Sequence, residues 1–204
     1  MPPPRPVLLS PIHSLISAFA AGAPSSTILT HFTASPIPLV HEHGGCYFRH
    51  GLPFLGRDFI GLSRVGEYFD LLAEYLSYRD MVFESEDDWV VDPQNMTICL
   101  RGQAQFTYKE TGESWNETFM WRVTLSEDLT GESEPGPGQG LKVQEYQVWA
   151  DTAAVFLASR GELKHVAKGT GVEMNVRPMT GSKESDYPAK HKLGDGLSAY
   201  GSCG

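Results

Sequence analysis

The first third of the chain carries apolar residues at the spacing of helices. A helix is predicted from Ser10, as its N-cap, and Pro11, in its first turn, to Gly22, which ends it. A second, short helix is predicted after residues 24–26, and a third over residues 61–77. The apolar faces of the three helices are Ile12, Leu15, Ile16 and Phe19; Ile28, Leu29 and Phe32; and Leu62, Val65, Phe69, Leu72 and Leu76.

From about Arg79 the apolar positions recur every second residue, which is the period of a half-buried strand. One strand, or a bulged pair, is expected over residues 81–91, around a group of acidic side chains. Residues 97–108 and 115–124 alternate over their whole length, so they are predicted to be antiparallel neighbours. Residues 141–149 form the last predicted strand. Helices followed by antiparallel strands indicate an α+β fold.

The remaining segments define the expected domain organisation. A short helix is predicted over residues 151–161, and residues 126–140 are rich in Gly and Pro, as in a flexible hairpin insertion. Residues 169–204 show little periodicity and are predicted to be a disordered C-terminal tail. Residues 1–9 are expected to be an N-terminal extension, which leaves residues 10–168 as the folded domain.

Composition and charge narrow the possible partners. The chain has 204 residues, of which 41% are hydrophobic, and a formal net charge of −9. Such a charge repels nucleic-acid phosphates and anionic lipid, so neither nucleic acid nor a membrane is an expected partner. The odd number of cysteines, Cys46, Cys99 and Cys203, indicates free thiols, and no apolar run reaches the roughly 20 residues of a membrane span. We therefore expect a cytoplasmic protein.

Several motifs together resemble the nuclear-transport-factor-two-like superfamily, and within it the SnoaL-like (polyketide cyclase-like) group common in fungi. The resemblance covers about residues 10–160 and implies a cone, in which a strongly curved antiparallel sheet wraps three N-terminal helices. It also implies a pocket at the wide end of the cone. Relatives include ketosteroid isomerases, scytalone dehydratase, polyketide cyclases and members with no known reaction. The motifs are the segments 41–44, 52–57, 68–72, 102–106, 115–119 and 146–151.

The resemblance implies proton-transfer chemistry on an apolar substrate without a cofactor. Such chemistry needs a base that reaches a carbon-bound proton and a donor to the resulting oxyanion. His41 and His43 share a strand face expected to meet the pocket, and Glu117 and Glu145 lie on apolar strand faces. These four residues are the candidate catalytic groups.

Each candidate has a structural alternative. The histidines could instead hydrogen-bond the backbone of residues 44–57, and either glutamate could pair with Arg101 or Arg122. A metal site built from the two histidines and His50 is disfavoured, because pairs of histidines without a metal are far more common.

Eight further residues are predicted to bind substrate: Tyr47, His50, Phe54, Tyr68, Trp121, Tyr146, Trp149 and Asp151. Two of them have alternatives, since Asp151 occupies a favourable N-cap position and Tyr68 lies beside the apolar stripe of its helix.

The sequence thus favours a cyclase, isomerase or dehydratase of secondary metabolism that acts on a polyketide- or terpenoid-like molecule. A homodimer formed through the outer sheet face is expected. The alternatives are a non-catalytic module of the same fold, which binds a small molecule or a protein, and a structural protein whose own aromatic side chains fill the pocket.

Overall fold

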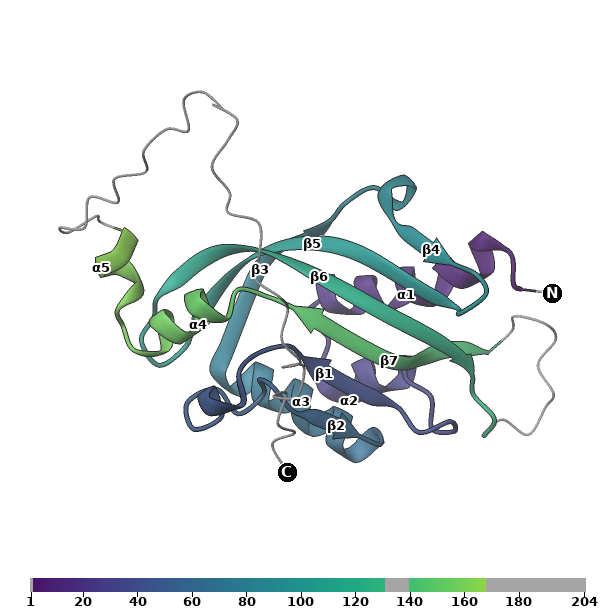
Figure 1. Ribbon diagram of the computed structural model, residues 1–204, viewed down its shortest axis with the longest axis horizontal. Helices are drawn as coiled ribbons and strands as arrows, with labels where there is room; N and C mark the ends of the chain where they lie inside the picture. The colour runs from purple at the N-terminus through teal and green to yellow at the C-terminus, as the bar shows by residue number, and fades with distance from the viewer. Residues whose placement is uncertain (1, 131–139, 168–204) are drawn as a thin grey trace, which may run out of the picture.

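A computed structural model describes residues 2–130 and 140–167. In it a long, curved sheet covers α1, α2 and α3, and α4 and α5 lie at one end of the sheet (Figure 1). The helices are α1 (Arg5–Ala20), α2 (Ser25–Ile28), α3 (Leu62–Tyr75), α4 (Thr152–Ser159) and α5 (Leu163–Ala167), with 3-10 turns at Leu29–His31, Cys46–Phe48 and Glu86–Asp88. The strands are β1 (Leu39–Glu42), β2 (Asp58–Ile60), β3 (Leu76–Phe83), β4 (Val90–Asp92), β5 (Thr97–Tyr108), β6 (Ser114–Glu127) and β7 (Leu141–Trp149). The predicted α+β class is confirmed.

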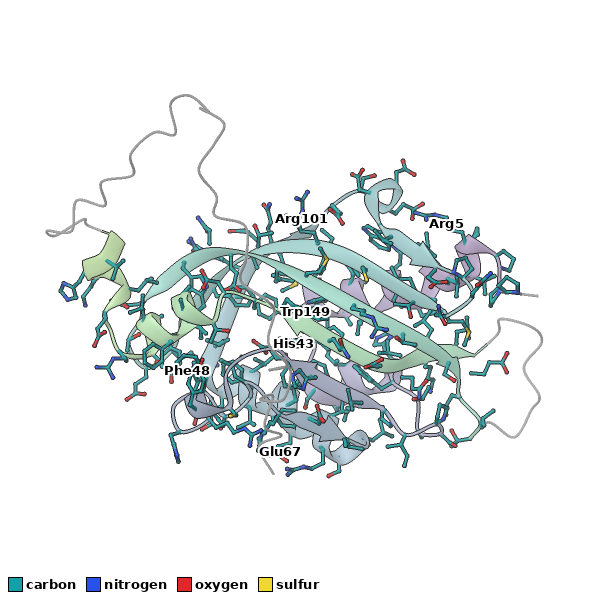
Figure 2. The ribbon with its side chains drawn as sticks, viewed as in Figure 1. Arg5, His43, Phe48, Glu67, Arg101 and Trp149 are labelled. Carbon is teal, nitrogen blue, oxygen red and sulfur yellow. The ribbon has the colours of Figure 1, made fainter. Side chains whose placement is uncertain are left out.

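The strands form one sheet in the order β2-β1-β7-β6-β5-β3, with β4 also paired to β5. All pairs are antiparallel except β1 and β7, which run parallel, so the sheet is mixed rather than wholly antiparallel as expected. The parallel pair continues past β1, where the His43 amide donates to the Val148 carbonyl at 2.8 Å. His43 and Trp149 therefore lie side by side on the sheet (Figure 2).

Helix α1 begins at Arg5, six residues before Pro11, the predicted first helical position. Pro11 lies inside the helix and removes one backbone hydrogen bond, but Leu8 and Leu9 in the preceding turn are buried in the core. Their burial outweighs the proline, so residues 5–9, predicted to belong to an extension, are part of the fold. The predicted stop is confirmed, because Gly22 adopts a φ of +63° and closes the helix.

The third predicted helix is present but ends at Tyr75, so Leu76, expected on its apolar face, is instead the first residue of β3. Helix α3 buries Val65, Tyr68 and Phe69 and passes directly into β3, where Asp80 has a φ of +55°. The pairing of β3 with β5 shifts register between Arg79 and Val82, which marks a bulge there. Around the acidic residues, where the sequence allowed a bulge, the chain instead forms the 3-10 turn Glu86–Asp88 between β3 and β4.

A few expectations need correction or fall outside the described residues. Cys99 is a free thiol, but Cys46 is disulfide-bonded, so the expectation of three free thiols is wrong. Residues 131–139 of the predicted hairpin insertion, Cys203 and the predicted tail lie outside the described residues. No helix in the described part of the chain is long and apolar enough to cross a membrane.

Gly102 sets how closely an aromatic side chain can lie on the concave face of the sheet. It pairs with Phe119 across β5 and β6, and a Cβ at this position would lie 2.4 Å from the Phe119 ring and 2.9 Å from the Phe83 ring. Phe119 lines a cavity between the sheet and the helices. The absence of a side chain at Gly102 thus shapes that cavity.

We expect Gly102→Ala to lower the free energy of unfolding by about 1–3 kcal/mol, because the buried Phe119 ring and the half-buried Phe83 ring must shift to admit the methyl group. Urea unfolding followed by circular dichroism measures the change. Gly51→Ala is the matched control, since a Cβ there meets no atom within 4 Å. Equal unfolding midpoints for the two variants would contradict this account.

Candidate functional site

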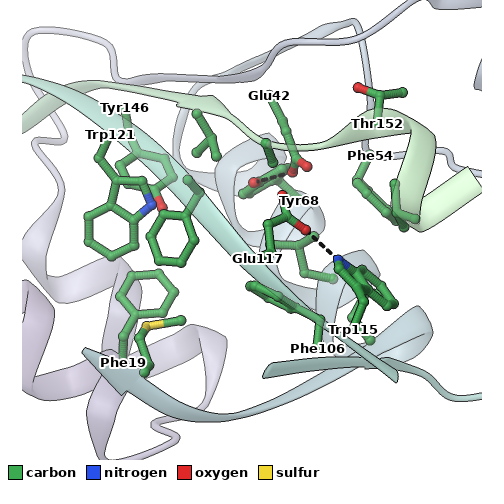
Figure 3. A pocket seen from close by; sticks show the side chains of 17 residues that line it. Phe19, Glu42, Phe54, Tyr68, Phe106, Trp115, Glu117, Trp121, Tyr146 and Thr152 are labelled. Carbon is green, nitrogen blue, oxygen red and sulfur yellow. Dashed lines mark hydrogen bonds between the residues drawn. The ribbon is translucent and has the colours of Figure 1, made fainter. Parts of the chain in front are cut away.

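A cavity of about 70 Å³ lies between the concave face of the sheet and the helices (Figure 3). Its wall is mainly aromatic and aliphatic, and two carboxylic acids, Glu42 and Glu117, are its acidic residues. The aromatic part of the wall consists of Phe19, Phe54, Tyr68, Phe106, Trp115, Phe119, Trp121 and Tyr146. A pair of acids in an apolar enclosure is a candidate site for proton transfer.

Glu42 is the last residue of β1, and its side chain points into the fold, where only 7% of the residue is exposed. The Tyr68 hydroxyl, from α3, donates a hydrogen bond of 2.7 Å to its carboxyl group. Burial raises the pKa of Glu42 to about 7, the Tyr68 hydrogen bond opposes this shift, and the charge of Glu117 adds to it. Near neutral pH Glu42 therefore exchanges between its protonated and ionised forms.

Glu117 lies in the middle of β6 and is 8% exposed. Trp115 Nε1 and the backbone amide of Asp151 each donate to its carboxyl group at 2.5 Å. Burial raises the pKa of Glu117, while both hydrogen bonds oppose the rise. Two donors on one carboxyl group also hold its orientation, so Glu117 is the better-anchored anion of the pair.

Tyr146 adds a donor without a partner to the same wall. It is 3% exposed, and its hydroxyl makes no hydrogen bond to the described residues, whereas the Tyr68 hydroxyl is bonded to Glu42. Burial and the charge of Glu42 raise the pKa of Tyr146 well above its ordinary value. The hydroxyl group thus stays protonated and can donate a hydrogen bond to a ligand oxygen.

Five of the twelve predicted site residues line this cavity: Phe54, Tyr68, Glu117, Trp121 and Tyr146. The sequence analysis did not name Glu42 as a candidate; from the sequence it was expected to orient one imidazole or to face outward. The apolar residue Val40 could have indicated that Glu42 faces inward, because residues two apart in a strand share a face. In the structure Val40 is fully buried.

His41 and His43 lie on the opposite face of β1, so the expectation that they meet the pocket is wrong about the face. His41 Nδ1 lies 2.6 Å from Asp58 Oδ1, and the His43 ring stacks on Trp149 with centroids 4.0 Å apart. Trp149 is 40% exposed on this outer face and does not line the cavity. Alternation along the strand requires this arrangement once Val40 and Glu42 face inward.

Three more predicted residues lie away from the cavity. Glu145 pairs with Arg122 at 3.1 Å, which is the alternative raised for it from the sequence. Tyr47 and His50 are exposed in the loop after β1. Within the described ranges, no group of three His, Cys, Asp or Glu side chains could hold a metal ion.

Asp151 acts on the site through its backbone. Its carboxylate caps α4 by accepting from the amides of Ala153, at 2.9 Å, and Ala154, at 3.2 Å, as the capping alternative predicted. Its own amide donates to Glu117. The cap thus fixes the chain where β7 passes into α4 and thereby positions the Glu117 carboxyl group.

Comparison with known proteins identifies the fold. No protein-family model and no curated protein matches the chain. PrhC from Penicillium brasilianum aligns with a TM-score of 0.54 at 16% identity, over 82% of this chain and 94% of its own. BvnE pinacolase from Penicillium brevicompactum gives 0.52 at 13%, over 80% and 98%, and an NTF2-like protein from Burkholderia xenovorans gives 0.53 at 13%, over 75% and 95%. The chain has the NTF2-like cone fold, as the resemblance predicted.

The buried Glu42 makes stability depend on pH in a defined window. The carboxyl group holds its proton up to about pH 7 in the folded state, against an ordinary value of 4.5. Between these values the folded state binds more protons than the unfolded state, so the free energy of unfolding falls as pH rises. The loss is at most about 1.4 kcal/mol for each pH unit.

Glu42→Gln, which keeps an acceptor for Tyr68, is expected to remove this slope. Urea unfolding at several pH values between 4.5 and 7.5 measures it. The difference between wild type and variant cancels the titrating groups that do not interact with Glu42, and it reports Glu42 together with its coupling to Glu117. Glu127→Gln, at the exposed end of β6, is the control and should run parallel to the wild type. A Glu42→Gln curve that is also parallel would contradict the buried acid.

Proposed function

We propose that this protein is a proton-transfer enzyme, a cyclase, isomerase or dehydratase, that acts on an apolar carbonyl compound with its own side chains. The observation that carries the proposal is the pair Glu42 and Glu117, two buried carboxyl groups with raised pKa values in one apolar cavity. Two acids whose surroundings differ can take the opposite roles of acid and base.

The hydrogen bonds indicate which acid has which role. Glu117 accepts two strong hydrogen bonds, which favour its anion, so it is assigned as the base. Glu42 has a pKa of about 7 and is assigned as the proton donor, with the free Tyr146 hydroxyl as a second donor to the same oxygen.

The proposed step balances without a redox partner. Glu117 takes a proton from the carbon next to a carbonyl group. The C–H electron pair forms the new C=C bond, and the carbonyl π pair moves to the oxygen, so that an enol or enolate forms. Glu42 protonates that oxygen, or Tyr146 stabilises its charge. Return of the proton to another carbon gives isomerisation, loss of a hydroxyl group as water gives dehydration, and attack on a second carbonyl group gives ring closure.

Two further observations support the class of substrate and reaction. The cavity wall is aromatic and aliphatic apart from the two acids and the hydroxyl groups, which suits a polyketide- or terpenoid-like skeleton. A pinacolase is among the solved structures that share the fold. In this proposal His41, His43 and Glu145, on the outer face, take no part in the chemical step.

The test is deuterium exchange and turnover in D₂O with a panel of apolar cyclic ketones and 1,3-diketones, followed by mass spectrometry. Glu117→Gln and Glu42→Gln should each lower kcat by about 10²–10⁴-fold, because each removes one proton-transfer group. Glu127→Gln, on the same strand as Glu117 but exposed, should keep the wild-type rate.

The outcomes separate the functions. Full activity of Glu117→Gln would overturn the proposal. Tight binding of panel members without exchange or turnover would instead favour the non-catalytic binding module.

The pH profile gives an independent check. We expect kcat/KM to fall above about pH 7, where Glu42 loses the proton that it donates. In Glu42→Gln the slower residual reaction should lack this alkaline decline, because glutamine does not titrate. A decline that persists in the variant would assign the donor to another group.

A further inference from the structure

The cavity that holds Glu42 and Glu117 is too small for the substrate class proposed above. Its volume is about 70 Å³, whereas ligand pockets measure roughly 300–1,000 Å³. It has room for a few water molecules, not for a polycyclic skeleton. A substrate that reaches the two acids must therefore displace part of the wall.

A second hollow lies directly behind one part of that wall. We call it the α1–β3 groove; it has a volume of about 440 Å³ and is lined by residues 20–23, 73, 76–81 and 109. Leu76 and Met81 line both the groove and the inner cavity. These two side chains are thus the partition between the cavity and the groove, and the two spaces together reach the size of a ligand pocket.

Met81 is the movable part of the partition. Methionine is unbranched and has three rotatable side-chain bonds, so it changes shape at lower cost than Leu76. It lies in the bulge between Arg79 and Val82, next to Asp80 with its φ of +55°, where the strand leaves regular pairing. Tyr78, in contrast, is anchored by its hydroxyl, which donates to the Phe19 carbonyl at 2.8 Å.

The groove differs from the inner cavity in its charges. Arg79 and Lys109 line it, and Arg79 is 72% exposed, with its Nε donating to Gln105 at 2.6 Å. Asp80, the acidic residue of the lining, is 83% exposed, and its Oδ2 lies 3.8 Å from Arg79 Nε. With this pair formed, the lining keeps a net positive charge from Lys109. The guanidinium and ammonium groups favour an acceptor or an anion at the outer end of the groove.

We propose that the α1–β3 groove is the outer half of the substrate site, and that an elongated apolar molecule with a carboxylate end lies across Met81. Its reacting end is placed between Glu42 and Glu117, which rests on the proposed function, and its carboxylate end lies near Arg79 and Lys109. Met81 then acts as a specificity-determining residue, because its side chain must swing aside before a long ligand can occupy both spaces.

The test is a fluorescence titration of the full chain with cis-parinaric acid, an 18-carbon conjugated fatty acid that emits in apolar surroundings. The probe is excited where tryptophan does not absorb. Met81→Trp should raise the Kd by about tenfold or more, because the indole blocks the passage. Val82→Trp is the matched control: the same change one residue along, at a side chain that is 58% exposed, should leave the Kd within about twofold.

Met81→Ala widens the passage and should bind the probe at least as tightly as wild type does. The proposal can therefore be tested even if the fold does not accommodate the indole of Met81→Trp. Near-UV circular dichroism establishes that each variant is folded. Equal Kd values for Met81→Trp and Val82→Trp would overturn the proposal, as would a wild-type protein that does not bind the probe.

Binding is measured without turnover, so the two proposals fail separately. Glu127→Gln, exposed at the end of β6 and outside both spaces, should bind the probe as wild type does. Full turnover by Glu117→Gln with the expected Met81 pattern would reject the catalytic assignment and keep the groove. Loss of turnover in Glu117→Gln, together with an unchanged Kd for Met81→Trp, would keep the catalytic assignment and reject the groove.

Discussion

The site depends on the cost of holding two carboxyl groups away from water. A buried carboxylate is unfavourable unless it is hydrogen-bonded or takes up a proton, and the two acids here meet this cost in different ways. Glu42 is bonded by a single neutral hydroxyl group and takes up a proton near neutral pH, whereas Glu117 accepts two donors that favour its anion. One aromatic cavity thus holds a carboxyl group that is protonated near neutral pH beside one whose hydrogen bonds favour its anion.

The scaffold supplies each donor from a different part of the chain. Parallel pairing of β1 with β7 brings Glu42 to the concave face, and α3 places Tyr68 against it. The β7–α4 junction, fixed by the Asp151 cap, presents an amide to Glu117. The geometry of the acids therefore depends on tertiary contacts that join β1 to α3 and β6 to α4.

The shape of the cavity follows from small departures from regular structure. Gly102 lets Phe119 lie close against the sheet, and the bulge in β3 places Met81 between the cavity and the α1–β3 groove. Curvature and bulges commonly re-aim side chains next to functional sites. Here they enclose the two acids in a space of about 70 Å³ beside a groove of about 440 Å³.

Local pattern was enough to predict the long strands β5, β6 and β7, and the inward face of β6 that carries Glu117, because β6 alternates over its whole length. In β7 a register shift interrupts the alternation, so Glu145 lies on the outer face although the pattern had placed it on an apolar face. It was not enough for β1, which has four residues, so the face of Glu42 was set by pairing with β7 and by the burial of Val40. The start of α1 likewise followed from burial of Leu8 and Leu9, which no capping rule contains. Periodicity determines which face of a strand is buried when the strand is long and regular. For a short strand, the buried face depends on what the rest of the chain packs against it, and the same holds for the residue at which a helix begins. Only the tertiary structure contains that information.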